Sequence, residues 1–148
     1  MTATATPFLM FEGAAEEAMT FYTSLFADGE ILSIERHTKE SAGNLEPGQE
    51  IPEGMNDVAG KVLQGAFRVA GQRFYVSDSF VQHGFTFTPS ISVFVELDEE
   101  AEVDRIANAL AEGGQFLMPL GDYGFSSRFA WAQDRFGITW QVSLTSAA

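Results

Sequence analysis

The sequence contains one pattern of expected elements twice, and this internal repeat constrains the fold more than any other feature. Residues 6–77 and 90–143 each predict a strand, an acidic turn, an amphipathic helix ending at glycine, and then further strands. Two glycine pairs align the copies, Gly29 with Gly114 and Gly71 with Gly137. Because self-similarity of this kind marks a repeated structural unit, we expect two related modules, at about 6–80 and 85–143.

Hydrophobic spacing predicts the same elements in both copies. Residues 7–11 and 91–95 predict strands, and residues 14–26 and the segment after Asp98 predict helices with glutamates in their first turns. Asp98 is expected to cap the second helix, whose apolar stripe is Val103, Ile106, Ala107 and Leu110. Residues 68–76 predict a hairpin, and 129–131 with 139–142 predict its counterpart.

The first copy carries an insertion at about residues 39–56. This segment is rich in glycine, proline and glutamate, a composition typical of loops. Two interpretations stay open: a solvated excursion, or a lid over a site, since long loops in compact domains are often functional.

Alternation along the strands predicts one apolar and one mixed face for each sheet. Ile138, Trp140 and Val142 share an apolar face, which we expect to pack on a helix. The mixed faces carry aromatic and polar residues together, which indicates a pocket for a small molecule. An oligomer interface is the alternative. The pocket candidates on these faces are Phe8, Met10, Tyr75, Phe94 and Gln141.

Charge and composition exclude several classes of function. The chain has 148 residues, with 8 basic and 21 acidic side chains and a net charge of −13, which disfavours nucleic acid and anionic membranes as partners. It has no cysteine, so disulfides and zinc–thiolate sites are excluded. Neither a signal peptide nor a membrane span is expected, and we predict a cytoplasmic protein.

Three stretches resemble the PhnB-like family, also called the 3-demethylubiquinone-9 3-methyltransferase domain, of the vicinal oxygen chelate superfamily. They are residues 6–13, residues 21–26, and the long run 114–123 through 128–131 to 134–141. The resemblance implies an α+β fold: two βαβββ modules forming a curved mixed β-sheet around a cavity, the glyoxalase/bleomycin resistance fold. It also implies a homodimer.

The resemblance further implies where a divalent metal would bind. Superfamily enzymes use the first and last strand of each module, and these positions fall here on Thr6, Tyr75, Ser90 and Gln141. Asp78 is a nearby alternative to Tyr75. Hard divalent metals prefer carboxylate or imidazole ligands, which the four positions do not supply. We therefore expect no metal and no cofactor.

The remaining candidates lie near the second module. Asp122 and Tyr123 could hydrogen-bond a ligand and Arg128 could hold an anion, or these residues could serve turn chemistry and surface ion pairs. Trp131 could line the pocket. The two histidines, His37 and His83, are interpreted as surface residues, although a ligand role is the alternative.

Three hypotheses about function remain open. The preferred one is a metal-free small-molecule binding protein. The second is a superfamily enzyme of the isomerase, transferase or dioxygenase type with an atypical metal site, and the third is a structural or regulatory dimer. A methyltransferase is not expected, since the chain has no glycine-rich G-x-G-x-x-G turn after its first strand.

Overall fold

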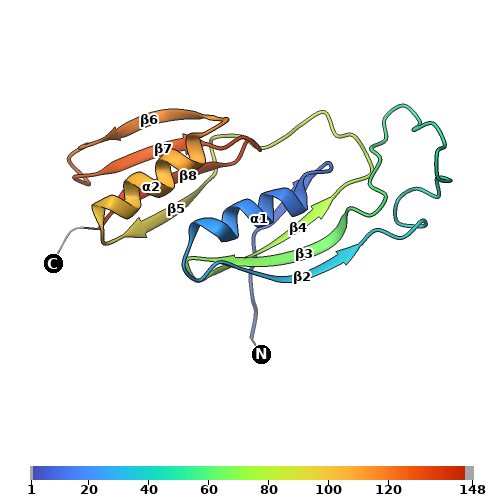
Figure 1. The fold of residues 1–148 in the computed structure, drawn as a ribbon, viewed down its shortest axis with the longest axis horizontal. Helices are drawn as coiled ribbons and strands as arrows, with labels where there is room; N and C mark the ends of the chain where they lie inside the picture. Colours follow the sequence, from blue (N-terminus) through green and yellow to red (C-terminus); the bar gives the residue numbers. More distant parts are fainter. Residues whose placement is uncertain (1, 146–148) are drawn as a thin grey trace. The chain divides into compact units, whose positions relative to one another are not determined.

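The computed structural model describes residues 2–145, and the chain divides into two compact units between Gly84 and Phe85 (Figure 1). The first unit contains β1 (Phe8–Phe11), α1 (Ala15–Leu25), β2 (Glu30–Arg36), β3 (Val62–Val69) and β4 (Gln72–Asp78). Its sheet has the order β1-β4-β3-β2. The β1–β4 pair is parallel, whereas the other two pairs are antiparallel.

The second unit repeats this topology. It contains β5 (Ser92–Leu97), α2 (Glu100–Ala111), β6 (Gln115–Gly121), β7 (Phe129–Gln133) and β8 (Thr139–Leu144), with sheet order β5-β8-β7-β6. The parallel pair is again the first strand with the last, β5 with β8. The predicted βαβββ pattern is therefore confirmed in each unit.

In both units the apolar face of the sheet packs against the helix, as alternation predicts. In the first unit, the Tyr22 ring of α1 lies 5.8 Å from the ring of Phe67 on β3, and Phe67 stacks on Phe74 of β4 at 5.0 Å. In the second unit, the four stripe residues of α2 are all buried, and Trp140 of β8 is 1% exposed. These clusters form the cores of the two units.

The aligned glycines Gly29 and Gly114 share a steric requirement. Each follows a helix and leads into a strand, where the chain turns back onto its own unit. A Cβ atom at Gly29 would collide with the main-chain carbonyl of Thr23, and one at Gly114 would collide with that of Gln133. No side chain fits at either position, so glycine is required at this turn in both copies.

The start of α2 differs from the prediction by one residue. Its N-cap is Glu99, and no side chain caps the helix. The main-chain carbonyl of Glu99 accepts the N–H groups of Glu102 and Val103, both at 3.1 Å. The expected Asp98 cap is therefore wrong, because the helix begins one residue later than an Asp98 cap requires.

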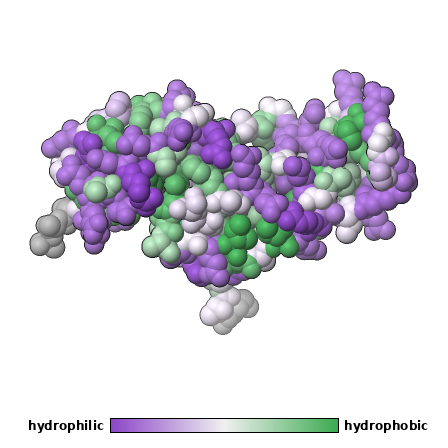
Figure 2. Space-filling view, in the orientation of Figure 1, coloured by the Kyte–Doolittle hydropathy of each residue, from purple (hydrophilic) through white to green (hydrophobic). Residues whose placement is uncertain are grey.

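One face of the molecule is drawn with its residues coloured by hydropathy in Figure 2. Purple, hydrophilic residues predominate on the face drawn in Figure 2, in agreement with the net charge of −13. Among residues 2–145, every helix is too short or too polar to cross a bilayer.

Candidate functional site

The second sheet has an open face, opposite α2, on which aromatic and polar side chains alternate. Strand register places Gln141 of β8 between Phe94 of β5 and Trp131 of β7. The Gln141 amide Nε2 donates a 2.7 Å hydrogen bond to Ser92 Oγ. The Phe94 side chain is 52% exposed, while the indole Nε1 of Trp131 is buried without a hydrogen-bonding partner in the described chain. The sequence-predicted candidates Phe94, Trp131 and Gln141 therefore lie together.

The open face of the first sheet brings the other three strand candidates together. Phe8 of β1 is paired in register with Tyr75 of β4, and Met10 with Ser77. Phe8 is 54% exposed. The guanidinium carbon of Arg73 lies 5.1 Å from the centre of the Tyr75 ring, a cation–π contact. This face thus presents an aromatic surface with one nearby positive charge.

The strand register shows which residue of the second unit corresponds to Thr6. Phe8 pairs with Tyr75 as Phe94 pairs with Gln141, so Thr6, two residues before Phe8, corresponds to Ser92. Ser90 precedes β5, and its hydroxyl lies 3.3 Å from that of Thr88. The sequence could not show whether Ser90 or Ser92 is the counterpart of Thr6, because a shift of two residues leaves every side chain on the same face.

The donor set at these positions does not fit a divalent metal. With Ser92 in place of Ser90, the positions supply two aliphatic hydroxyls, a phenol and a carboxamide, and no carboxylate or imidazole. Mn²⁺, Fe²⁺, Ni²⁺ and Zn²⁺ sites in proteins are built mainly from the groups that are missing here. No group of three or more His, Cys, Asp or Glu side chains within residues 2–145 is arranged to hold a metal ion.

Asp78, the alternative ligand, is fully engaged in holding the first unit together. Its side chain is 1% exposed. Oδ1 accepts the main-chain N–H groups of Gly13 at 2.8 Å and Ala15 at 3.0 Å, and Oδ2 accepts that of Val62 at 3.0 Å. The carboxylate therefore ties the turn before α1 to the start of β3, and the geometry favours a structural role.

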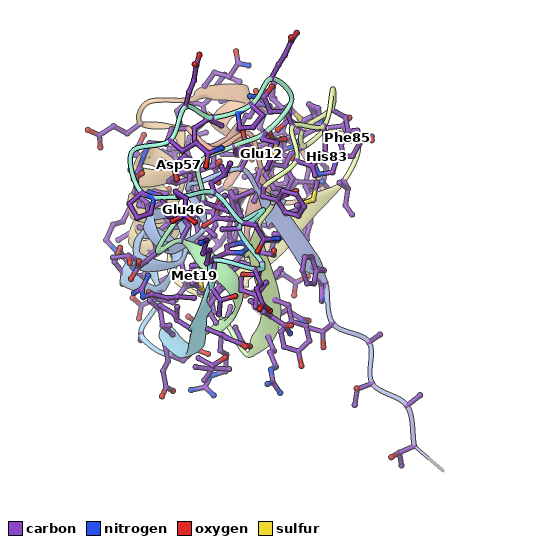
Figure 3. All side chains as sticks on the ribbon, turned by 90° about the vertical axis from the view of Figure 1, so that its right-hand side faces the viewer. Glu12, Met19, Glu46, Asp57, His83 and Phe85 are labelled. Atoms are coloured by element: carbon purple, nitrogen blue, oxygen red, sulfur yellow. The ribbon has the colours of Figure 1, made fainter. Side chains whose placement is uncertain are left out.

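The two histidines are half-buried and hydrogen-bonded, so the interpretation as plain surface residues understates their role. His37 Nε2 donates to the main-chain oxygen of Asp78 at 2.6 Å, and its Nδ1 lies 2.9 Å from Ser41 Oγ. His83 Nε2 lies 2.8 Å from Ser79 Oγ. The His83 main-chain N–H also donates to Glu12, beside which it is drawn in Figure 3. Neither lies on a strand.

Turn chemistry accounts for Asp122 and Tyr123. The Asp122 carboxylate accepts the N–H of Gly124 at 2.9 Å, and the Tyr123 hydroxyl donates to the Pro119 carbonyl at 2.6 Å. Tyr123 and Phe125 also cover Phe129 of β7 with edge-on ring contacts. This loop is thus closed by its own hydrogen bonds.

Arg128 lies on the α2 side of the second sheet. Its Nε and Nη2 donate to the two carboxylate oxygens of Asp104 at 2.7 and 3.1 Å, and Glu100 lies 3.7 Å away. The hydrogen bond that Arg128 donates to Asp104 raises the pKa of Arg128 above its ordinary value. Asp104 thus occupies the Nε/Nη2 side of the guanidinium in bidentate fashion, so the structure favours the ion-pair alternative over a pocket role.

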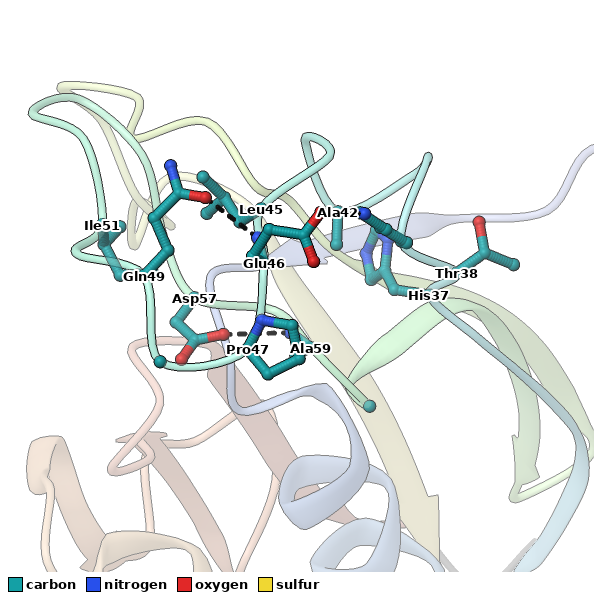
Figure 4. A pocket seen from close by; sticks show the side chains of 13 residues that line it. His37, Thr38, Ala42, Leu45, Glu46, Pro47, Gln49, Ile51, Asp57 and Ala59 are labelled. Carbon is teal, nitrogen blue, oxygen red and sulfur yellow. Dashed lines mark hydrogen bonds and ion pairs between the residues drawn. The ribbon is translucent and has the colours of Figure 1, made fainter.

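The first unit has a cavity of about 400 Å³ whose lining residues the sequence did not predict, although a lid over a site was one interpretation of the 39–56 segment (Figure 4). It is formed by His37 and Thr38, by the 39–56 segment, and by residues 57–60. Phe8, Met10 and Tyr75 do not line it. The available signal was the apolar residues dispersed through an otherwise polar insertion: Ala42, Leu45, Pro47 and Ile51.

The comparison with protein families decides the relationship. The family described as 3-demethylubiquinone-9 3-methyltransferase matches residues 3–143. The chain belongs to this family. It is 45% identical to the PhnB protein of Bacillus cereus, covering 97% of this chain and 100% of that one, with a TM-score of 0.80.

Two further solved structures extend the comparison. Protein PA1353 of Pseudomonas aeruginosa is 25% identical, with 99% and 100% of the two chains covered and a TM-score of 0.74. A glyoxylase/bleomycin resistance protein/dioxygenase domain from Frankia is 10% identical, with 100% and 95% covered and a TM-score of 0.62, which shows the fold. The predicted family and fold class are thus confirmed. No functionally curated protein matches the sequence.

Proposed function

We propose that this PhnB-like protein binds a small molecule on the open face of its second sheet, without a resident divalent metal. The observation that carries the proposal is the setting of Gln141. Its amide nitrogen is committed to Ser92, whereas its carbonyl oxygen accepts no bond from the described chain, and aromatic residues lie on both neighbouring strands. A few placed polar groups among apolar side chains are typical of ligand sites.

The chemistry of these groups defines the ligand. The free Gln141 oxygen accepts an N–H or O–H, while Phe94 and Trp131 offer flat apolar surface. A neutral ring compound with one hydrogen-bond donor satisfies both requirements. A carboxamide does not titrate near neutral pH and cannot act as a general base, so Gln141 supports binding rather than proton transfer.

The methyltransferase in the family name does not suit this fold. Nucleotide-type cofactors bind at the edge of a doubly wound parallel sheet, next to a glycine-rich turn. Here each sheet has a single parallel pair, and β1 leads into Glu12 and Gly13 without such a turn.

We extend the proposal to a homodimer as the assembly that carries the site.

The test is a thermal-shift screen of neutral aromatic compounds that carry N–H or O–H donors, using metal-free protein. We expect saturable stabilisation by a subset of compounds. Gln141→Leu should abolish it, whereas Gln72→Leu, an exposed glutamine at the β3–β4 hairpin, should preserve it. Stabilisation that requires added Mn²⁺, or that survives Gln141→Leu, would contradict the proposal.

A further inference from the structure

The cavity beneath the 39–56 segment has the properties of a second ligand site. Its volume of about 400 Å³ lies within the range of small-molecule pockets, roughly 300–1,000 Å³. Leu45, Pro47 and Ile51 give it an apolar wall, and the side chains of Glu46 and Asp57 add carboxylates (Figure 4). All of its lining residues belong to the first unit.

The segment that forms this cavity is fastened at both ends. At its start, the His37 ring bonds both to the Asp78 carbonyl and to Ser41. At its end, Asn56 Nδ2 donates to the main-chain oxygen of Ser79 at 3.0 Å, and Met55 forms a β-bridge with Val81. These bonds anchor the two ends of the segment that walls the cavity.

The charges around the cavity leave one carboxylate without a cation. Lys39 forms an ion pair with Glu46, so these two charges offset each other. Asp57 Oδ1 accepts the Ala59 N–H at 3.2 Å, and no lysine or arginine within residues 2–145 pairs with Asp57. A carboxylate beside apolar surface favours a cation that has an apolar body.

We propose that this cavity binds a small organic cation, an amine attached to an apolar ring or chain, whose N–H groups donate to Asp57. The net charge of −13 supports this choice, because it raises the local concentration of cations around the protein. This site is separate from the open face of the second sheet, and neither proposal depends on the other.

The experiment is an NMR titration of the full-length ¹⁵N-labelled protein with three probes that share one ring: benzylamine, benzyl alcohol and benzoate. We expect benzylamine to cause saturable amide shifts within residues 37–60, with an affinity at least about tenfold above that of benzoate. Asp57→Asn should lower the affinity for benzylamine at least about fivefold and leave the affinity for benzyl alcohol unchanged. Glu53→Gln, an exposed carboxylate of the same segment outside the lining, should change neither.

Three outcomes would overturn the inference. They are benzoate binding as tightly as benzylamine, equal benzylamine affinity in the Asp57→Asn and wild-type proteins, and shifts centred on Trp131 and Gln141 instead of residues 37–60. The unperturbed part of each variant's spectrum reports whether the variant is folded, so lost binding and lost structure are distinguishable.

Discussion

Asp78 illustrates how one buried carboxylate organises a βαβββ unit. Three main-chain N–H groups from two separate segments converge on its two oxygens. A charged acceptor of this kind stabilises the folded state because the donors would otherwise be buried without partners. An activity loss in an Asp78→Ala variant would therefore reflect damage to the fold rather than the loss of a metal ligand.

Asp78→Asn should lower the free energy of unfolding by about 2–4 kcal/mol, since one donor of the new amide would face a main-chain N–H. Urea unfolding followed by circular dichroism measures this. Asp98→Asn is the matched control, because Asp98 is exposed between β5 and α2, and we expect a change within about 0.5 kcal/mol. Equal stability of the two variants would contradict the structural role of Asp78.

Asp28 makes the stability of the first unit depend on pH. Its two oxygens accept the N–H groups of Gly71 and Ala70, both at 2.8 Å, and Arg68 lies nearby. The hydrogen bond from Gly71, followed by that from Ala70 and the charge of Arg68, lowers the pKa of Asp28 below its ordinary 3.8. A lowered folded-state pKa stabilises the fold above the unfolded-state value, and this stabilisation is lost as the pH falls through the folded value.

Asp28→Asn should thus lower the free energy of unfolding by about 1 kcal/mol or less at pH 7, because the side chain is 42% exposed and solvent screens its charge. The difference between wild type and variant should shrink in acid, below pH 3.8. Paired urea titrations at pH 7 and in acid test this. A stability difference between wild type and variant that grows in acid would contradict a lowered pKa of Asp28 in the folded state.

At the scale of the elements, the β3–β4 hairpin has an unusual turn residue. Ala70 adopts φ 49° and Gly71 φ 79°, so both central residues are left-handed. Two-residue hairpin turns of this kind favour asparagine followed by glycine, whereas the Cβ of alanine is sterically crowded in the left-handed conformation.

Ala70→Asn should therefore raise the free energy of unfolding by about 0.5–1 kcal/mol, as measured by thermal or urea unfolding. Ala109→Asn is a counter-control in the helical interior of α2, where asparagine is less favourable than alanine and should lower stability. A loss of stability in Ala70→Asn would contradict the turn assignment.

Local pattern was sufficient to predict most elements but not the sites. Alternation and the helical stripe identified Trp140, Val142 and the buried face of α2, because these depend on neighbours close in sequence. The roles of Asp78 and Arg128 depend on partners on other elements, which the spacing of residues does not reveal. The lining of the 400 Å³ cavity was not predicted for the same reason, since long-range hydrogen bonds fasten the insertion that forms it.

At the scale of the whole molecule, the sequence repeat corresponds to a repeat of the strand pairing in the two units. Both units place the first and last strands side by side, so the positions where the superfamily resemblance implies metal ligands lie on these adjacent strands or just before them. In this chain those positions have hydroxyl and amide groups. One of these positions, Gln141, belongs to the ligand site that we propose on the second sheet.

The most direct test of this account is the metal content of untagged protein after incubation with Mn²⁺, Fe²⁺, Ni²⁺ or Zn²⁺ and dialysis. We expect no stoichiometric metal in any case, and we expect the screened ligands to bind metal-incubated and metal-free protein equally. One metal per chain, or one per two chains, that is lost in Gln141→Leu and Tyr75→Phe would contradict it.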